Sequence, residues 1–331
     1  MSQPTVYDVA EKAGVSTATV SRVLNSSNNV SSPTRIKVLE AIQELGFVPK
    51  AEAVARARSR HGRIGVMAPF FTQPSFAQRL HGVATVLADS PYELVVYTVD
   101  SSSRRDAYLS SLQVSPRVDG LIVMALPFGA SIGERLQANN LETVMIECSL
   151  PFFTSIEIDD RAGGRMAAEH FLQQGHRRFG FVGDTDLPDY AIYPSDRRLE
   201  GYRDALASAG HQLPDACVAL APHGRGPAYH SAQRLLDLAD PPTAIFAASD
   251  TQAMGVLWAA RERGLEVPRD LCVIGFDDLE IAEYIGLTTV SQQLEGSGRL
   301  AAELLLARLG DGSRPIQHIR LPLTFIKRQT A

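Results

Sequence analysis

The hydrophobic pattern changes character near residue 63. Before that point, apolar residues recur every three or four positions, a spacing typical of amphipathic helices. After it, short apolar runs alternate with longer amphipathic segments, which predicts parallel sheets with helices on both faces. The runs are "RIGVMAPF" (63–70), "YELVVYTV" (92–99), "VDGLIVMAL" (118–126), "LETVMIEC" (141–148), "RRFGFVG" (177–183), "TAIFAAS" (243–249) and "DLCVIGFD" (270–277). The sequence therefore predicts a small helical unit followed by a larger α/β body.

The first part reads as three helices. The first has Val6, Val9, Ala10 and Ala13 on one face and ends at Gly14, a residue suited to a helix C-terminus. The second is capped by Ser16 and has Val20, Val23 and Leu24 as its apolar positions. The third is expected to have Ser32 as its cap, Pro33 at its first position and a buried stripe of Ile36, Leu39, Ile42 and Leu45 before Gly46.

Two helices joined by a tight turn, with a third in support, form the helix-turn-helix plan. Periodicity alone would fit any small three-helix domain. The exposed face of the second helix separates the two interpretations, because its residues are small or hydrogen-bonding and include one long cation. Such a face can enter a DNA major groove closely. Its residues are Thr17, Ala18, Thr19, Ser21, Arg22 and Asn25.

The body contains enough strand–helix units for two sheets. Their boundary is expected near "SIEIDDRAGGRM" (155–166), where a strand gives way to a helix that opens with Asp160, Gly163 and Gly164. In open α/β folds, ligands bind at the carboxyl ends of the strands. The candidates there are Phe70, Phe71, Glu147, Ser249, Asp250, Asp277 and Asp278, with Arg198 in the nearby segment "YPSDRRLEGYRD".

These candidates also have structural interpretations. Asp250 and Asp278 suit the caps of the helices that follow them, and Phe70 and Phe71 suit a core. Arg197, Arg198 and Arg203 suit a solvated helix face. As binding residues, a guanidinium and carboxylates would match the hydroxyls of a sugar, and aromatic rings would match its apolar face.

Composition and charge refine this division. The 331 residues are 45% hydrophobic and 21% charged, as in ordinary globular proteins. Residues 1–62 contain eight Lys/Arg and five Asp/Glu, a net +3, while the remainder is 24 − 32 = −8. A basic end on an acidic body favours a polyanion-binding module joined to a unit with another task.

Several classes are disfavoured. The three cysteines, Cys148, Cys217 and Cys272, lie far apart and form no CxxC or Cys/His pattern, so reduced buried thiols are expected rather than a zinc or disulfide site. No cofactor motif is present, and GxSxG and GxxxxGK[ST] are both absent. The N-terminus has no apolar segment suited to secretion and no run could span a bilayer, which predicts a cytoplasmic protein that does not contact a membrane.

The segments "TVYDVAEKAGVSTATVSRVLN" and "VSSPTRIKVLEAIQELGFVP" closely resemble the headpiece of the LacI/GalR family of bacterial transcription regulators, and the likeness continues more loosely along the chain. The resemblance implies a homodimer that binds a pseudo-palindromic operator in double-stranded DNA. It places Thr17, Ala18 and Arg22 at base edges, with Arg22 suited to guanine. It assigns phosphate contacts to Tyr7, Ser16, Thr19, Ser21, Asn25 and Ser31.

For the body, the resemblance implies a two-lobed effector domain of the periplasmic-binding-protein type I fold, with three chain crossings between the lobes. The implied division is a headpiece at 1–48, a hinge at 49–62 and an effector and dimerisation domain at 63–331. Its first lobe is about 63–158 and 292–320, and its second is about 159–290 and 321–329. The effector arginine corresponds to Arg198 and the sugar-binding aspartate to Asp277. Further effector positions are Ser75, Phe76, Glu147, Ser249, Asp250 and Gln292.

Two features depart from the family pattern. Phe70 stands where the family often has a polar residue, which suggests a larger or more apolar ligand than a simple hexose. The hinge segment "VARARSRHGR" (54–63) has arginine, at Arg56 or Arg58 according to register, where the family has a leucine that enters the minor groove. These arginines either enter a narrow A·T-rich minor groove or contact phosphates only.

Two other function classes share parts of this pattern. A carbohydrate-acting enzyme would also have a sugar-sized cleft with carboxylates, but no acid pair stands in a recognisable catalytic setting. A solute-binding transport protein would share the body but would have no use for the helix-turn-helix. A ligand-controlled DNA-binding regulator, most simply a repressor with a sugar effector, is therefore the function we expect. Because no heptad repeat follows the body, we expect a dimer and not a tetramer.

Overall fold

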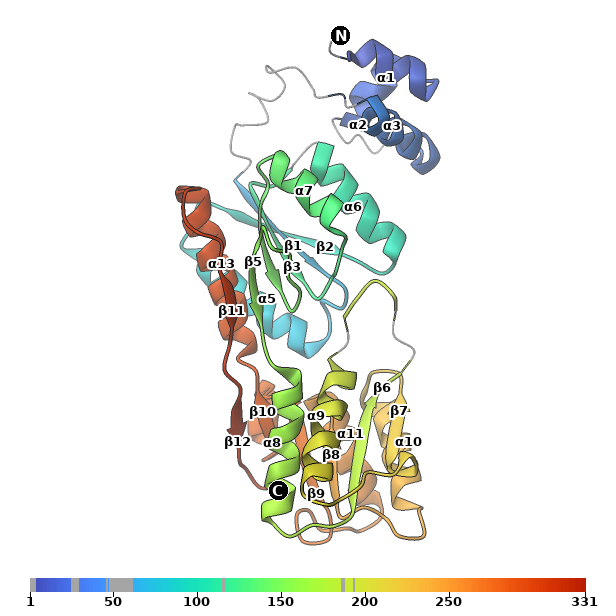
Figure 1. Ribbon diagram of the computed structural model, residues 1–331, viewed down its shortest axis with the longest axis vertical. Helices are drawn as coiled ribbons and strands as arrows, with labels where there is room; N and C mark the ends of the chain where they lie inside the picture. Colours follow the sequence, from blue (N-terminus) through green and yellow to red (C-terminus); the bar gives the residue numbers. More distant parts are fainter. Residues whose placement is uncertain are drawn as a thin grey trace.

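The computed structural model describes residues 4–24, 30–45, 47, 62–114, 117–185, 188–192 and 194–331. Two α/β lobes follow one another along the long axis, and the N-terminal helices lie beyond the first lobe (Figure 1). Three of the predicted DNA-contacting residues, Asn25, Arg56 and Arg58, are outside the described residues.

The three N-terminal helices are α1 (Val6–Ala13), α2 (Thr17–Leu24) and α3 (Ser32–Leu45). As predicted, Gly14 ends α1 in the left-handed conformation, with φ of +65°. The hydroxyl of Ser16 accepts a hydrogen bond from the Thr19 amide at 3.2 Å and so caps α2. Val9, Val20 and Val38 are fully buried where the three helices meet, so this unit has its own small core.

Two predictions for α3 were wrong. The helix already begins at Ser32, and the carbonyl of Ser31 accepts from the Arg35 amide, so the boundary residue is Ser31. In the predicted stripe, Ile42 is buried and Leu39 and Leu45 pack against the same core, but Ile36 is 56% exposed. Val38 and Ala41 are buried instead. Val38 and Ala41 have helical spacing to Ile42 and Leu45, and packing against α1 and α2 buries them in place of Ile36.

The first sheet is wholly parallel, with strand order β11-β5-β4-β3-β1-β2. Helices α5 and α13 cover one face, and α6 and α7 cover the other. The strands are β1 (Arg63–Ala68), β2 (Glu93–Thr98), β3 (Gly120–Met124), β4 (Glu142–Ile146), β5 (Thr154–Glu157) and β11 (His318–Arg320). The helices are α5 (Pro74–Ala88), α6 (Ser102–Val114), α7 (Ala130–Ala138) and α13 (Leu294–Gly310).

The second sheet has the order β12-β10-β9-β8-β6-β7 and is parallel except for β12, which is antiparallel to β10. Its faces are covered by α8 with α9 and by α10 with α11. The strands are β6 (Phe179–Asp184), β7 (Val218–Ala221), β8 (Ala244–Ala247), β9 (Cys272–Asp277), β10 (Thr288–Ser291) and β12 (Thr324–Ile326). The helices are α8 (Asp160–Gln173), α9 (Ser195–Ser208), α10 (Arg225–Leu236), α11 (Asp250–Glu262), α12 (Glu280–Tyr284) and the 3-10 turn Asp215–Cys217.

The chain passes between the two sheets at three places. It leaves the first sheet after β5, returns after β10, and leaves again between β11 and β12. All seven apolar runs named from the sequence are strands. The short strands β7, β10, β11 and β12 were not predicted because each has only three or four residues, too few to establish a period.

Helices α8 and α9 pack very closely because glycines line their contact. A Cβ on Gly164 would lie 1.9 Å from the Arg198 carbonyl oxygen, and one on Gly201 would lie 1.9 Å from the Arg161 carbonyl oxygen. Real atoms cannot approach so closely, so any side chain here would separate the helices. This packing positions α9, which carries Arg198, against the start of α8.

We predict that Gly201→Ala lowers the free energy of unfolding by about 1–3 kcal/mol, the usual cost of overpacking. Urea denaturation measures the change. Gly226→Ala in α10 is the matched control, because its Cβ would meet nothing within 4 Å. The control should be neutral or stabilising by about 0.5–1 kcal/mol. Similar losses in both variants would show that close α8–α9 packing is not the cause.

Candidate functional site

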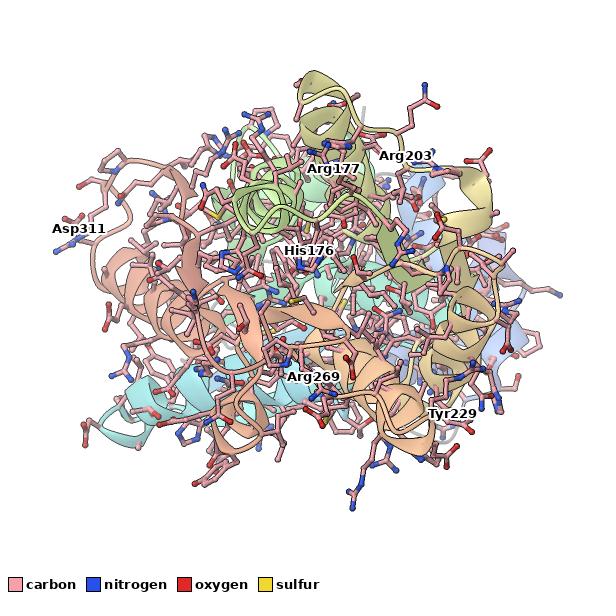
Figure 2. The ribbon with its side chains drawn as sticks, turned by 90° about the horizontal axis from the view of Figure 1, so that it is seen from below. His176, Arg177, Arg203, Tyr229, Arg269 and Asp311 are labelled. Atoms are coloured by element: carbon pink, nitrogen blue, oxygen red, sulfur yellow. The ribbon has the colours of Figure 1, made fainter. Side chains whose placement is uncertain are left out.

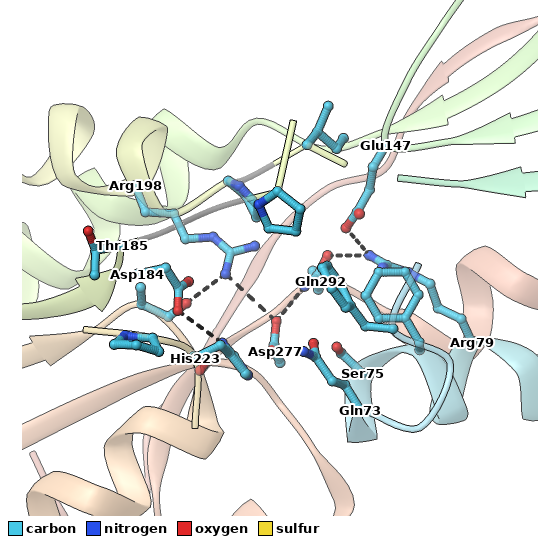
Figure 3. Close-up of a pocket in the computed structure, with 18 residues that line it drawn as sticks. Gln73, Ser75, Arg79, Glu147, Asp184, Thr185, Arg198, His223, Asp277 and Gln292 are labelled. Atoms are coloured by element: carbon cyan, nitrogen blue, oxygen red, sulfur yellow. Dashed lines mark hydrogen bonds and ion pairs between the residues drawn. The ribbon is translucent and has the colours of Figure 1, made fainter. Parts of the chain in front are cut away.

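A pocket of about 240 Å³ lies between the lobes, at the carboxyl ends of strands from both sheets. The first lobe supplies residues after β1 and β4 and from α5. The second lobe supplies residues after β6, β7, β8 and β9, together with α9. Gln292, in the second chain crossing, lies between the two sets (Figure 3). This is the location expected for a ligand in such folds.

Arg198 is the central cation on the second-lobe side. Its side chain is buried, and its Nη1 donates to the Ala248 carbonyl at 2.6 Å. Its Nε donates to Asp160 at 2.9 Å, and its Nη1 lies 3.9 Å from the Asp277 carboxylate. The guanidinium stacks on the Phe276 ring, with Cζ 3.5 Å from the ring centroid. Arg198 is therefore held rigidly, with its charge directed at the pocket.

Arg79 is a second buried cation, on α5 of the first lobe. It forms an ion pair with Glu147, donates to the Gln292 side-chain oxygen at 2.8 Å and donates through Nε to Ser297 at 3.3 Å. The Gln292 amide nitrogen in turn donates to the Asp277 carboxylate. A continuous polar chain thus joins Glu147 in the first lobe to Arg198 in the second (Figure 3).

The carboxylates at the ends of β4 and β9 stand on unusual backbone. Glu147 has φ of +64° and Asp277 has φ of +119°, a region that side-chain-bearing residues avoid. Such conformations persist only where the surroundings hold them, and they cluster at functional sites. Here they aim both carboxylates toward the cleft.

Burial raises the pKa of Asp277 to about 6, even though Arg198, Gln292 and Arg79 favour its ionised form. Burial likewise raises the pKa of Asp160, partly offset by Arg198. In the second lobe, burial favours the neutral form of His223. Its hydrogen bond with Asp184 at 3.0 Å and the negative charges of Asp184 and Asp277 nevertheless raise its pKa overall. The pocket is thus lined by ionisable side chains, Asp277 and His223, whose pKa values are raised from their usual range.

The pocket also has apolar lining residues, which come from both lobes. Phe70 contacts Phe76 edge-on, with ring centroids 6.0 Å apart. The apolar lining residues are Phe70, Phe76, Pro188, Ile192, Pro194, Pro222 and Ala248. A bound molecule would therefore contact hydrocarbon as well as hydrogen-bonding groups.

The structure brings eight of the ten predicted effector residues together at this pocket: Phe70, Ser75, Phe76, Glu147, Arg198, Ser249, Asp277 and Gln292. It does not bring in Phe71 or Asp250. Phe71 is 38% exposed, beyond the lining. Asp250 is fully buried behind the pocket, where it accepts hydrogen bonds from the Leu279 amide and the Thr289 hydroxyl.

The Ser249 and Asp250 pair shows why sequence reasoning erred. Ser249, not Asp250, is the N-cap of α11 and accepts from the Gln252 amide. Asp250 instead ties the turn after β9 to β10. Burial and the charge of Asp277 raise the pKa of Asp250 well above its usual value.

Sequence reasoning missed Arg79, Asp184 and His223. Arg79 lies in the middle of α5, in an amphipathic pattern where a cation normally faces water. Asp184 ends β6 and His223 follows β7, and their proximity results from the neighbouring positions of β6 and β7. No local signal identifies such residues.

The predicted DNA-facing residues that the structure describes lie on α1, on α2 and at the starts of α2 and α3, and each is exposed or half-buried. Tyr7 on α1 is 73% exposed, and Ala18, Ser21 and Arg22 are exposed on α2. Thr17 and Thr19 are half-buried, and Ser16 and Ser31 are exposed at the starts of α2 and α3. The Ser16 hydroxyl is partly engaged, since it hydrogen-bonds to the Thr19 hydroxyl at 2.9 Å.

The far end of the second lobe carries another group of arginines, seen in Figure 2. A groove there is lined by Arg177, Arg178 and Arg269. Arg178 pairs with Asp240, and Arg269 pairs with Glu266 and Asp270. Neighbouring carboxylates thus compensate most of its positive charge. Burial lowers the pKa of the adjacent His176, whose Nδ1 hydrogen-bonds with the Thr243 hydroxyl at 3.0 Å.

Within the described residues, no helix is long and apolar enough to cross a membrane, and no group of three or more His, Cys, Asp or Glu could hold a metal ion. The three cysteines are free thiols. Cys148 and Cys272 are buried, whereas Cys217 is only half-buried. Burial raises the pKa of Cys148 to about 12, so its thiol is unreactive.

Comparison with known proteins agrees with this architecture. Residues 5–50 match the family described as bacterial regulatory proteins, lacI family, and residues 168–331 match a periplasmic binding protein-like domain. The chain is 33% identical over 324 residues to the HTH-type transcriptional repressor CytR of Escherichia coli strain K12, covering 94% of this chain and 92% of CytR. The chain belongs to the lacI family.

Two solved structures extend the likeness to three dimensions. A complex of the transcriptional regulator CelR with cellobiose has a TM-score of 0.71 and 29% identity, covering 99% of this chain and 100% of that one. The lac repressor dimer bound to operator and the anti-inducer ONPF has a TM-score of 0.70 and 28% identity, covering 99% of both chains. This lacI-family chain is accordingly a DNA-binding transcriptional regulator and not an enzyme.

The raised pKa of Asp277 leads to a prediction about stability. Between about pH 4 and pH 6, the folded regulator keeps the Asp277 proton while the unfolded chain has lost it. The folded state then binds more protons, so the free energy of unfolding falls as pH rises through this interval. We predict that Asp277→Asn, which cannot titrate, reduces that fall by roughly 1–3 kcal/mol.

Urea denaturation at pH 4 and pH 6.5 measures the difference. Asp311→Asn is the control, because this exposed carboxylate has a lowered pKa owing to its hydrogen bonds from Ser313. The control should leave the fall in place. An Asp277→Asn chain with an unchanged pH dependence would mean that Asp277 is ionised throughout.

Proposed function

We propose that this protein is a repressor whose affinity for its operator is controlled by a sugar-class effector bound between the two lobes. The observation that carries the proposal is the joint presence of an exposed helix-turn-helix face and an interlobe pocket in which Arg198 and Asp277 face each other. DNA recognition and ligand recognition thus belong to one chain.

The chemistry of the pocket supports a sugar-class effector. Sugar hydroxyls both donate and accept hydrogen bonds, and the pocket supplies guanidinium and amide donors next to carboxylate acceptors. Phe70 and Phe76 supply an apolar surface for the ring carbons. The solved CelR complex contains cellobiose, and a lacI-family regulator from Enterococcus faecium was solved with ribose, which supports this ligand class.

On the DNA side, we propose that Arg22 binds a guanine through both of its terminal nitrogens, with Thr17 and Ala18 at neighbouring bases. The remaining headpiece residues, including Asn25, contact phosphates. Arg56 and Arg58 supply the DNA contacts of the segment that joins the headpiece to the body. The lac repressor structure is a dimer on its operator, which supports a homodimer here. We propose that this homodimer acts in the cytoplasm on a pseudo-palindromic site.

The residue boundaries are proposed as 1–48 for the headpiece, 49–62 for the hinge and 63–331 for the effector and dimerisation domain. Effector control acts through the crossings between the lobes. Gln292 lies in the second crossing, and Asp160 follows the first, so both crossings connect to the polar chain around Arg198. An effector that competes for these hydrogen bonds would change the relative positions of the lobes.

Arg22→Ala should weaken operator binding about 10- to 100-fold and relax the preference for guanine at one position of each half-site. Fluorescence anisotropy at fixed salt, with operators carrying each base at that position, measures both effects. Lys12→Ala is the control of equal charge change, because Lys12 pairs with Glu44. If Arg22→Ala weakens all sequences equally, Arg22 contacts phosphate rather than a base.

Arg198→Ala and Asp277→Ala should each reduce effector affinity at least about 100-fold, since each removes a charged hydrogen-bonding partner of the sugar hydroxyls. Calorimetric titration with a panel of mono- and disaccharides measures binding, and anisotropy measures release from the operator. Leu220→Ala on β7, outside the pocket, is the control. Sugar binding that survives both pocket substitutions would exclude this cleft as the site.

A further inference from the structure

The connection between β6 and α9 belongs to the second lobe but reaches the first. It leaves β6 at Asp184 and enters α9 at Ser195, and Figure 1 shows it extending across to the first lobe. We call its residues 188–192 the strap. Tyr190 and Ala191 are each only 8% exposed, and both belong to the first-lobe core on the α6 and α7 side of the sheet. A segment of one lobe is thus buried in the other.

Specific polar contacts hold the strap in this position. The Ile192 amide donates to the Ala125 carbonyl at 3.1 Å, just beyond the end of β3. The Ser102 hydroxyl at the start of α6 donates to the Asp189 carboxylate at 2.6 Å. Ala125 has φ of +52°, a strained value at the point where the strap docks. The docking is therefore a defined contact with matched donors and acceptors.

The docked strap also forms part of the effector pocket. Pro188 and Ile192 line it, next to Pro194. Phe70 of the first lobe lines the same pocket, and its ring centroid lies 6.4 Å from that of Tyr190 behind it. Tyr190 does not line the pocket. It acts through Phe70 and by anchoring the strap, which makes it a positioning residue.

The remaining pocket walls differ in chemistry from this end. Arg198, Asp277 and Gln292 offer hydrogen bonds, whereas the strap and Phe70 offer hydrocarbon. A simple sugar has hydroxyls around its whole rim and would leave some of them unpaired against this apolar end. An effector with a polyhydroxylated part and an apolar part would match both ends.

We propose that the strap and Phe70 form an apolar subsite, complete only when the strap is docked on the first lobe, which accepts an apolar or aromatic group attached to the sugar of the effector. This inference rests on the proposed sugar-class effector and specifies the chemistry of the group attached to its sugar. Effector binding and strap docking then stabilise each other, because both bury the same apolar surface.

The test uses matched pairs of methyl and phenyl β-glycosides of glucose, galactose, xylose and ribose, titrated calorimetrically into the full chain. Within the pair that binds, we expect the phenyl glycoside to bind at least about tenfold more tightly than the methyl glycoside, since the ring becomes buried. Ile192→Ser and Tyr190→Ala should bring this ratio close to one, because they remove apolar surface from the subsite or release the strap that completes it. Tyr190→Phe, which keeps the ring, should retain the preference.

The outcomes separate the two proposals. A pair that binds with equal affinities, or a phenyl preference that persists in both Ile192→Ser and Tyr190→Ala, overturns the subsite and leaves the sugar-class effector in place. Binding of none of the eight glycosides and of no plain sugar in the panel overturns the sugar-class effector, and the subsite with it.

A second measurement examines the docking without any ligand. In hydrogen–deuterium exchange of the full chain, the Ile192 amide should be protected, and Tyr190→Ala should accelerate its exchange at least about tenfold. Amides within α11, remote from the strap, report whether the fold is retained. Ser102→Ala and Asp189→Ala should have equal effects that do not add, because they remove the two ends of one hydrogen bond. Unchanged exchange in these variants would contradict the docking.

Discussion

Two arginines buried at the junction of the lobes impose the main constraint on this structure. Arg79 and Arg198 are each only 3% exposed, and an uncompensated buried charge would be severely destabilising. Each is therefore surrounded by acceptors: Glu147, Gln292 and Ser297 around Arg79, and Asp160, Asp277 and the Ala248 carbonyl around Arg198. These partners come from both lobes and, in the case of Gln292, from the second chain crossing. The relative placement of the lobes is thus coupled to charge compensation.

The same arrangement explains how a ligand could act at a distance. The polar chain is made of groups that a sugar hydroxyl can replace, so a bound effector alters the contacts that position the lobes. The packing around the chain is stiff, because glycines bring α8 and α9 into backbone contact and Phe276 supports the guanidinium of Arg198. Stiff packing favours transmission of a local change as a movement of whole elements. The strap adds an apolar contact between the lobes to this polar one.

The accuracy of sequence-based prediction varied with the range of the interactions involved. The ends of α1 and α2 followed from Gly14 and Ser16, because a left-handed residue and a capping hydroxyl act within one helical turn. The long apolar strands followed from hydrophobicity alone, because strands buried on both faces are nearly continuous apolar runs. In α3, two faces of similar apolarity were available, and the choice between Ile36 and Val38 depended on the neighbouring helices.

The amino-acid sequence thus established the α/β body, the helix-turn-helix and the general position of the pocket, since these depend on local periodicity, capping and the carboxyl ends of strands. It also contained enough family-specific residues to place Arg198, Asp277 and Gln292 in the pocket. The pairing of Arg79 with Glu147, the exclusion of Asp250 and the insertion of Tyr190 into the first lobe emerged only on folding. Each of these depends on contacts between residues 29 to more than 60 positions apart. Such contacts are decided by topology and by the need to pair buried charges, and neither is encoded in a short window of sequence.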